Sequence, residues 1–388
     1  MISHCLVNKT HEVDYGIFPD VAQLDCISIV DGDHDLWFLE NTRLMQWLFA
    51  RQFMIFGTGG SSLGGQCIRE ISSQKENVTF INNLDPHTIR ETLGKISDDV
   101  NFLFISKSGE TLETIAQLLI IIEFLKSSGK TEEEIADRIV VITEAEPSSL
   151  RDMILQYNFF FVNHPKRIGG RFSVFSAVGM LPALICGIDP MKIRKAAKNY
   201  LDNYFRAAVD GAFFTKENYP QHVFFIYSDK LSCFGQWLAQ LYAESTGKLE
   251  AGITPLIARG TVDQHSQLQL YLAGPKNKCF TFLLEKQETK LRIPSEFTPP
   301  GFEYLKGKNL QSIFEAQCDA TLDSVLKKHL PIRKIEFDPL TPEVLGELFM
   351  HFMLEVIMVC NLMNVNAFDQ QAVEYAKNRT KELLSKNP

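Results

Sequence analysis

From about residue 53 onward, short apolar runs alternate along the chain with longer stretches whose apolar residues recur at helical spacing. A run of four to six apolar residues bounded by polar turns is typical of a buried strand, and the stretches between these runs are typical of packed helices. This βαβα order predicts a parallel sheet covered by helices on both faces. The five predicted strands occupy residues 53–56, 78–82, 102–105, 139–143 and 159–162.

A second, shorter α/β unit is predicted after the first. Residues 174–201 have the pattern of a helix with interruptions, and a boundary between the units is predicted near residue 210. The second unit resembles a shortened copy of the first. Its predicted elements are a strand at 223–227, a helix at 236–243, and strands near Leu270 and at 279–284.

The end of the chain is predicted to be helical. Thr341-Pro342-Glu343 places a capping residue before a proline at the first helical position, which is a favourable helix start. The expected fold class is therefore α/β, with two doubly wound parallel sheets and a helical C-terminal segment. The predicted divisions are a wrapping segment, two α/β domains and the C-terminal segment, at residues 1–45, 46–210, 211–340 and 341–388.

Composition narrows the range of partners. The chain of 388 residues carries a formal net charge of -8, and it has no basic run, so nucleic acid is not an expected partner. Its eight cysteines are scattered without a Cys-x-x-Cys pair or a His/Cys cluster, which predicts free thiols and no metal site. Two apolar tracts could be taken for membrane spans.

The tract 118–125 is too short to span a bilayer, and the tract 345–365 is interrupted by charged residues. With no secretory signal evident, we expect a cytoplasmic protein without a membrane partner.

The most informative tract is Phe102 to Thr111, where a predicted strand gives way to hydroxyls, a lysine and a glycine just before a helix. Unpaired N–H groups and the positive end of the helix dipole meet at such a helix start, so an anion can bind there. The candidate ligands of a phosphate are Ser106, Lys107, Ser108 and Thr111. Ordinary capping by serine and threonine explains the tract equally well.

A glycine cluster at residues 57–65 follows the first predicted strand and allows backbone amides to approach a ligand. A nucleotide-binding turn is the competing interpretation, because Asp85 lies near the place of a ribose-binding acid. Against it, a G-x-G-x-x-G pattern begun at Gly57 would need glycine where Ser62 stands. A glycine turn without any ligand also stays open.

Other polar residues have plain structural explanations when taken alone. Arg171 follows two glycines in a loop, where an arginine can approach an oxyanion but is more often solvated. Glu244 ends a helix with Gln240 one turn earlier on the same face, which is typical of surface residues. For His265 and Lys377 a solvated or capping role is the default.

Taken together, these motifs resemble the glucose-6-phosphate isomerase family, whose two domains share the sugar-isomerase fold. The resemblance extends from about residue 55 to 377 in the family's order. Ser-x-Ser-Gly-x-Thr at Ser106 to Thr111 is shared with many proteins of this fold. More specific are Gly169-Gly-Arg-Phe-Ser and Phe368-Asp-Gln with Val373-Glu and Lys377.

The resemblance implies a reversible isomerisation of glucose 6-phosphate to fructose 6-phosphate, in glycolysis and gluconeogenesis. The sugar ring opens first, and a proton then moves between carbons 2 and 1 through a cis-enediol. Glu244 would be the base, Arg171 would stabilise the enediolate, and His265 and Lys377 would assist ring opening. No cofactor is implied. The remaining implied substrate ligands are Gly60 and Ser61 along the sugar, Ser106, Lys107, Ser108 and Thr111 at the phosphate, and Gln240 and Gln370.

The family pattern also implies a homodimer, because its histidine reaches the site from the neighbouring subunit. This chain departs from the pattern at Lys166 and Ala372, and neither change removes a proposed catalytic group. It also departs at Thr246, where asparagine is more frequent, and in the Asp263 neighbourhood before His265. Three rivals stay open: an isomerase that also accepts mannose 6-phosphate, a sugar-phosphate-binding regulator of the same fold, and a nicotinamide-dependent enzyme. The isomerase half of an amidotransferase has no support, since no glutaminase precedes the first sheet.

Overall fold

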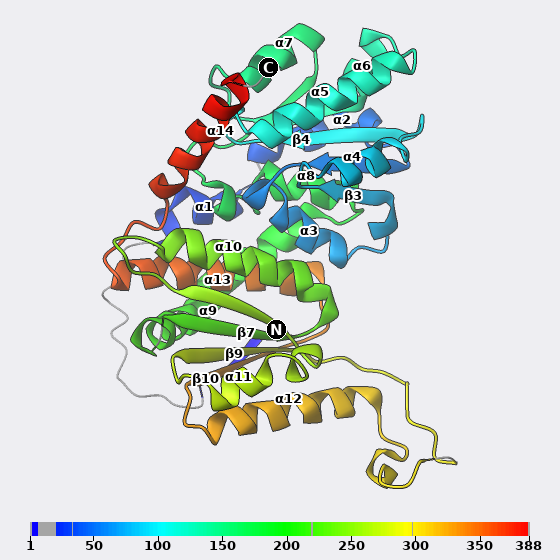
Figure 1. Ribbon diagram of the computed structural model, residues 1–388. Helices are drawn as coiled ribbons and strands as arrows, with labels where there is room; N and C mark the ends of the chain where they lie inside the picture. The colour runs from blue at the N-terminus through cyan, green and yellow to red at the C-terminus, as the bar shows by residue number, and fades with distance from the viewer. Residues whose placement is uncertain (1, 7–20, 33, 219, 297, 387–388) are drawn as a thin grey trace.

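A computed structural model describes residues 2–6, 21–32, 34–218, 220–296 and 298–386. Two five-stranded sheets lie one above the other, with helices between them and on their outer faces (Figure 1). This arrangement confirms the predicted fold class of two doubly wound sheets followed by helices.

The first sheet is entirely parallel, in the order β3-β2-β4-β5-β6. All five predicted strands form here, and their ends differ from prediction by at most two residues. Their near-continuous apolar sequence follows from burial on both faces. The strands are β2 (Gln52–Phe56), β3 (Val78–Ile81), β4 (Val100–Ile105), β5 (Ile139–Thr143) and β6 (Phe160–Asn163).

Helices cover both faces of this sheet. The side chains of Phe56 and Phe104 pack on one face with α5, and those of Ile55 and Ile105 pack on the other with α3 and α8. Asp85 caps α4 by accepting hydrogen bonds from the amides of His87 and Thr88, which gives it a structural role at that turn. The helices of this unit are α3 (Leu63–Glu70), α4 (Pro86–Leu93), α5 (Leu112–Ser127), α6 (Glu132–Arg138), α7 (Ser149–Tyr157) and α8 (Ala177–Ile185).

The second sheet has the order β1-β10-β9-β7-β8, with β1 antiparallel to β10 and the other neighbours parallel. The strands predicted at 223–227 and 279–284 are confirmed within it. The strand predicted near Leu270 is wrong, because that run forms a short helix that buries Tyr271 and exposes Leu270. The strands are β1 (Ile2–Leu6), β7 (Gln221–Tyr227), β8 (Thr254–Arg259), β9 (Lys278–Glu285) and β10 (Ile332–Phe337).

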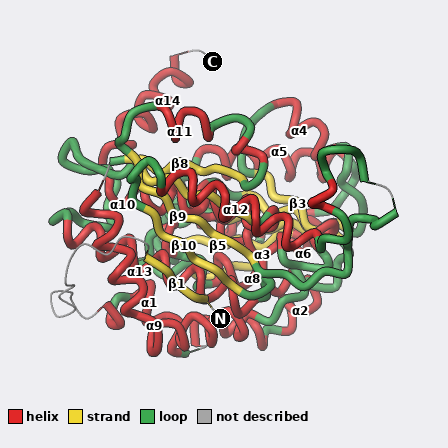
Figure 2. Tube along the Cα trace, turned by 90° about the horizontal axis from the view of Figure 1, so that it is seen from below, coloured by secondary structure: helices red, strands yellow, loops and turns green. Residues whose placement is uncertain are grey.

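Three long helices form the layer between the sheets, and two others cover the far face of the second sheet, where Figure 2 shows α12 crossing the strands. The helix start at Thr341 is confirmed, since its hydroxyl accepts from the amide of Val344. The predicted boundary near residue 210 falls inside α9. The helices are α9 (Pro190–Asn218), α10 (Ser232–Thr246), α11 (Leu268–Ala273), α12 (Leu310–Leu326), α13 (Pro342–Leu362) and, near the C-terminus, α14 (Glu374–Lys386).

Part of the predicted N-terminal wrapping segment lies outside the described residues, at positions 1 and 7–20. The described parts include β1, two short helices, α1 (Asp25–Ser28) and α2 (Thr42–Trp47), and short 3-10 turns. The side chains of Ile27, Phe38 and Leu44 are fully buried in the large central core. This part of the chain therefore packs on the rest of the protein.

A buried ionic network fastens the middle layer to the second sheet. Arg333 of β10 donates two hydrogen bonds to Glu355 of α13, at 2.6 and 3.0 Å. The same carboxylate accepts from Thr215 of α9 at 3.1 Å and from the Tyr242 hydroxyl of α10. Burial would raise the pKa of Glu355, but the adjacent Arg333 and His351 together outweigh burial and hold that pKa well below its usual range. Four elements are thus tied to one carboxylate.

No helix among the described residues is both long enough and apolar enough to cross a membrane. The tracts 118–125 and 345–365 lie largely in α5 and α13. Most side chains of the second tract are buried, whereas Leu119 and Ile120 of the first are exposed. The seven cysteines with described side chains are all free thiols.

Candidate active site

The turn between β4 and α5 contains the predicted phosphate ligands. The Ser106 hydroxyl is buried and lies 2.7 Å from that of Thr111, the residue that precedes the helix. Thr111 occupies the N-cap position, yet its side chain accepts no hydrogen bond from the helix. Ser108 accepts only from the amide of Glu110, at 3.2 Å. The hydroxyls therefore do not cap α5, which argues against the capping interpretation.

The conformation of this turn depends on a glycine and a neighbouring strand. Gly109 has φ +67°, and a Cβ atom there would lie 2.1 Å from the Ser148 hydroxyl. The amide of Glu144, just after β5, donates to the carbonyl of Lys107 at 3.1 Å. The Lys107 ammonium also lies 3.6 Å from the Glu144 carboxylate. The turn is thus fixed at the carboxyl edge of the sheet, with a lysine beside it.

The glycine cluster after β2 meets the Gly-Gly-Arg loop. Gly60 and Ser61 form a short 3-10 turn, and a Cβ atom on Gly60 would lie 2.1 Å from the carbonyl carbon of Gly170. Only glycine allows this approach between the two backbones. The glycines therefore bring the loop that carries Arg171 up to the carboxyl ends of β2 and β4.

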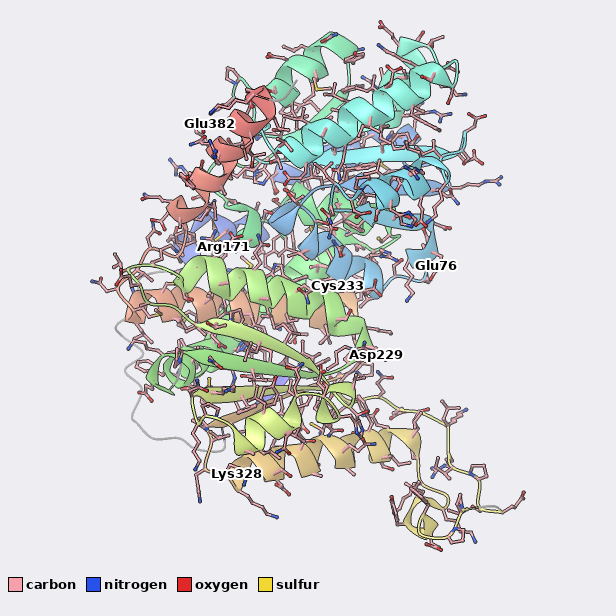
Figure 3. All side chains as sticks on the ribbon, in the orientation of Figure 1. Glu76, Arg171, Asp229, Cys233, Lys328 and Glu382 are labelled. Carbon is pink, nitrogen blue, oxygen red and sulfur yellow. The ribbon has the colours of Figure 1, made fainter. Side chains whose placement is uncertain are left out.

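Arg171 is 2% exposed and lies beside α10 (Figure 3). Its Nε donates to the Ser245 hydroxyl at 2.8 Å, and one terminal nitrogen donates to Glu244 Oε2 at 3.0 Å and Gln370 Oε1 at 2.7 Å. The other terminal nitrogen donates to the carbonyls of Ala367 at 2.5 Å and Asp369 at 3.1 Å. Burial lowers the pKa of Arg171 and Glu244 opposes this shift, so the guanidinium stays charged.

Glu244 is held from two sides near the C-terminal end of α10. Gln240, one turn earlier, donates to Glu244 Oε1 at 2.8 Å, and Arg171 holds Oε2. The carboxylate side chain is 36% exposed, so it can be reached from solvent. It borders an open cavity of about 750 Å³ between the end of α10 and residues 364–373, which Gln370 also lines.

The structure brings Arg171, Gln240, Glu244 and Gln370 together within the chain, but not His265 or Lys377. His265 is exposed after the turn that follows β8. Lys377 lies on α14, where its side chain is 63% exposed and pairs with Glu374 at 2.6 Å. Neither has a described contact with Glu244 or Arg171.

Three partners of Arg171 were not foreseen from the sequence: the Ser245 hydroxyl and the carbonyls of Ala367 and Asp369. Asp369 also pairs with Lys248 at 3.4 Å, and Phe368 packs its ring on Phe172. Backbone acceptors carry no sequence signal. The sequence offered one indication of these contacts. Ser245 is adjacent to predicted Glu244, and Ala367 and Asp369 lie close to predicted Gln370.

At the corresponding ends of β7 and β9 in the second sheet, a cavity of about 540 Å³ is lined by Ser228 and Glu285. The Ser228 hydroxyl donates to Glu285 across this gap at 2.5 Å, and the amide of Leu340 donates to the same carboxylate at 2.9 Å. A buried carboxylate repels an anion. The Glu285 carboxylate therefore disfavours a phosphate beside Ser228. Within the described ranges no cluster of three His, Cys, Asp or Glu could hold a metal ion.

The two doubly wound sheets, with a hydroxyl-rich turn at the switch point of the first, define a protein of the sugar-isomerase fold. The tagatose-6-phosphate ketose/aldose isomerase of Escherichia coli has a similar fold, with a TM-score of 0.56, 13% identity, and coverage of 90% of this chain and 92% of that one. The phosphoglucose isomerase family model matches residues 49–387. The chain belongs to this family.

Two further comparisons agree with that assignment. The glucose-6-phosphate isomerase of Campylobacter jejuni is 31% identical over 371 residues, which cover 91% of this chain and 89% of the relative. A hypothetical protein from Thermus thermophilus has a solved structure with a TM-score of 0.83 and 28% identity, covering 92% of this chain and 90% of that chain. The similarity therefore includes both sheets and most of the C-terminal segment.

Proposed function

We propose that this chain interconverts glucose 6-phosphate and fructose 6-phosphate by proton transfer through a cis-enediol intermediate. As a member of the phosphoglucose isomerase family it is an isomerase, and its substrate is a sugar phosphate. The observation that supports the mechanism most is the pairing of Glu244 with the buried Arg171, beside an open cavity. Such an enzyme serves glycolysis and gluconeogenesis.

The substrate phosphate binds in the turn before α5. Ser106, Ser108 and Thr111 supply hydroxyl donors, Lys107 supplies a positive charge, and the start of the helix adds backbone N–H groups. Gly60 and Ser61 lie at the adjoining strand end and line the sugar. This arrangement anchors the substrate at its phosphate and leaves carbons 1 and 2 to extend toward α10.

Glu244 is the base that moves the proton between carbon 2 and carbon 1. Removal of a proton beside a carbonyl group needs a positioned acceptor, and the hydrogen bonds from Gln240 and Arg171 fix the direction of this carboxylate. As the enediolate gains charge, the fixed cation Arg171 stabilises it more than it stabilises the neutral substrate. Gln240 contacts the substrate or orders the site, and Gln370 orders the site through its hydrogen bond with Arg171.

Ring opening is assigned to His265 and Lys377, and for His265 we propose a homodimer that places it in the neighbouring site. In support, His265 is exposed and has no described contact with Glu244 within its own chain. The segment between β9 and α12 also projects from the body of the molecule and exposes apolar side chains (Figure 1). These side chains are Leu291, Phe302 and Tyr304.

We also propose that the enzyme is cytoplasmic, because its cysteines with described side chains are free thiols.

The assay that tests this function couples fructose 6-phosphate conversion to glucose-6-phosphate dehydrogenase and follows NADPH. We expect turnover with no cofactor other than the NADP⁺ that the coupling enzyme reduces. A parallel assay with mannose 6-phosphate tests the dual-specificity alternative. Binding of fructose 6-phosphate without any turnover would favour the regulator instead.

A double substitution of Ser106→Ala and Thr111→Ala is expected to raise KM for fructose 6-phosphate about tenfold to a hundredfold, with a smaller effect on kcat. The two hydroxyls lie 2.7 Å apart and would act on one phosphate, to which hydrogen bonds are charge-assisted. The measurement is steady-state kinetics in the coupled assay. Ser127→Ala, at the exposed end of the same helix, is the control. An unchanged KM would return the turn to a purely structural role.

A further inference from the structure

The guanidinium of Arg171 has no hydrogen left for a substrate. Arginine carries five N–H donors, and all five of those on Arg171 are used within the chain. A group that is 2% exposed and fully paired cannot donate to an enediolate oxygen unless one of its present partners leaves. The proposed function therefore requires an exchange at this guanidinium.

Three of the five partners are poor candidates for leaving. The Ser245 hydroxyl is fully buried within α10, and Ala367 and Asp369 accept through backbone carbonyls. Moving any of them would displace backbone or leave a buried polar group unpaired, and either change is unfavourable. The exchangeable partners are the two side chains on one terminal nitrogen, Glu244 and Gln370.

Of these two, Gln370 is the easier to release. Its side chain is neutral, so its hydrogen bond to the guanidinium lacks the charge attraction that holds Glu244. Gln370 is itself exposed, and so is every described residue that follows it up to 386. The side chain can therefore turn aside without disturbing the core. Its oxygen must face Arg171, because a guanidinium offers only donors.

We propose that the amide oxygen of Gln370 is a resting-state substitute for the substrate oxygen on Arg171, and that the substrate displaces it when it binds. This inference rests on the proposed function and concerns the same site. In the absence of substrate, Gln370 keeps the buried cation hydrogen-bonded and shields it from water. When the substrate arrives, its oxygen at carbon 1 or 2 takes over the same N–H donor, while Glu244 stays in place as the base. Gln370 is thus a positioning residue whose contact is given up on binding.

The test is a calorimetric titration with a five-carbon aldonate phosphate, whose planar carboxylate imitates the enediolate. Gln370→Ala removes the competing oxygen and is expected to bind this probe about threefold to tenfold more tightly than the native chain. Gln370→Glu puts a carboxylate on the same nitrogen and is expected to bind it at least about tenfold more weakly, because the new charge holds Arg171 and repels the anion. Gln371→Ala, exposed and one residue away, is the matched control.

Weaker or unchanged binding by Gln370→Ala, with normal binding by Gln371→Ala, would overturn the proposal, because it would make Gln370 a direct ligand contact or a bystander. Titration with inorganic phosphate serves as the internal reference, since it reports on the turn before α5 and should not change in any of these variants. These titrations measure binding and not turnover. If the native chain failed to isomerise fructose 6-phosphate, the proposed function would be wrong, but the titrations would still show whether Gln370 competes with the probe for Arg171.

Discussion

Replacement of Glu244 by glutamine is expected to lower kcat for fructose 6-phosphate by about three orders of magnitude and to leave KM within a few-fold. A positioned general base contributes about 10²- to 10⁴-fold to a proton-transfer rate, and an amide cannot take the proton. The substitution should fit the site, because the amide oxygen can still accept from Arg171. The new NH₂ group would face the NH₂ group of Gln240, so the Gln240 amide must turn over for its unpaired Oε1 to accept from it.

Steady-state kinetics in the coupled assay measure this effect. Glu250→Gln is the matched control, since Glu250 lines the same cavity on the exposed turn after α10 without contacting Arg171. It should keep near-native kcat. Retention of kcat within fivefold by Glu244→Gln would remove Glu244 from the role of base, and the partners of Arg171 would then need another explanation.

Replacement of Glu355 by glutamine is expected to lower the free energy of unfolding by about 3–5 kcal/mol. The substitution keeps the shape of the side chain but removes the charge that balances Arg333, whose side chain is 1% exposed. An uncompensated buried cation is costly, and the amide NH₂ would also face donors from Arg333 and Tyr242.

Urea unfolding followed by circular dichroism at pH 7 gives this free energy. Glu343→Gln on the same helix is the control, because its ion pair with Lys192 is 4.0 Å long and half-exposed. That variant should change stability by less than about 1 kcal/mol. A loss below about 1 kcal/mol in Glu355→Gln would show that water or a rearrangement relieves the charge on Arg333.

The sequence predicts the first sheet well because its strands are buried on both faces and therefore appear as uninterrupted apolar runs. Two strands of the second sheet lack that signal. β8 lies at the sheet edge, is mostly half-exposed and contains Pro255, while β10 is interrupted by Arg333, Lys334 and Glu336. Arg333 looks like a surface residue in the sequence, and only the distant Glu355 makes its burial tolerable.

The candidate site, too, was predictable only where its signal is local in the sequence. Contiguous motifs such as Ser106 to Thr111 could be predicted as one phosphate-binding unit. The contacts that position Arg171 could not, since it reaches a carbonyl 196 residues away at Ala367. That contact depends on how α13 ends and on how the following segment returns to the Gly-Gly-Arg loop. The saturation of the five Arg171 donors becomes visible only in three dimensions.

The most direct test of the account is to isomerise fructose 6-phosphate in D₂O and to locate deuterium in the glucose 6-phosphate by NMR. A carboxylate that removes a proton from carbon 1 and returns it to carbon 2 exchanges part of it with solvent. Proton transfer through Glu244 therefore predicts deuterium at carbon 2 with the native chain, and loss of its formation in step with turnover in Glu244→Gln. Full turnover by the native chain with no deuterium at carbon 2 would indicate a hydride shift and contradict proton transfer through Glu244.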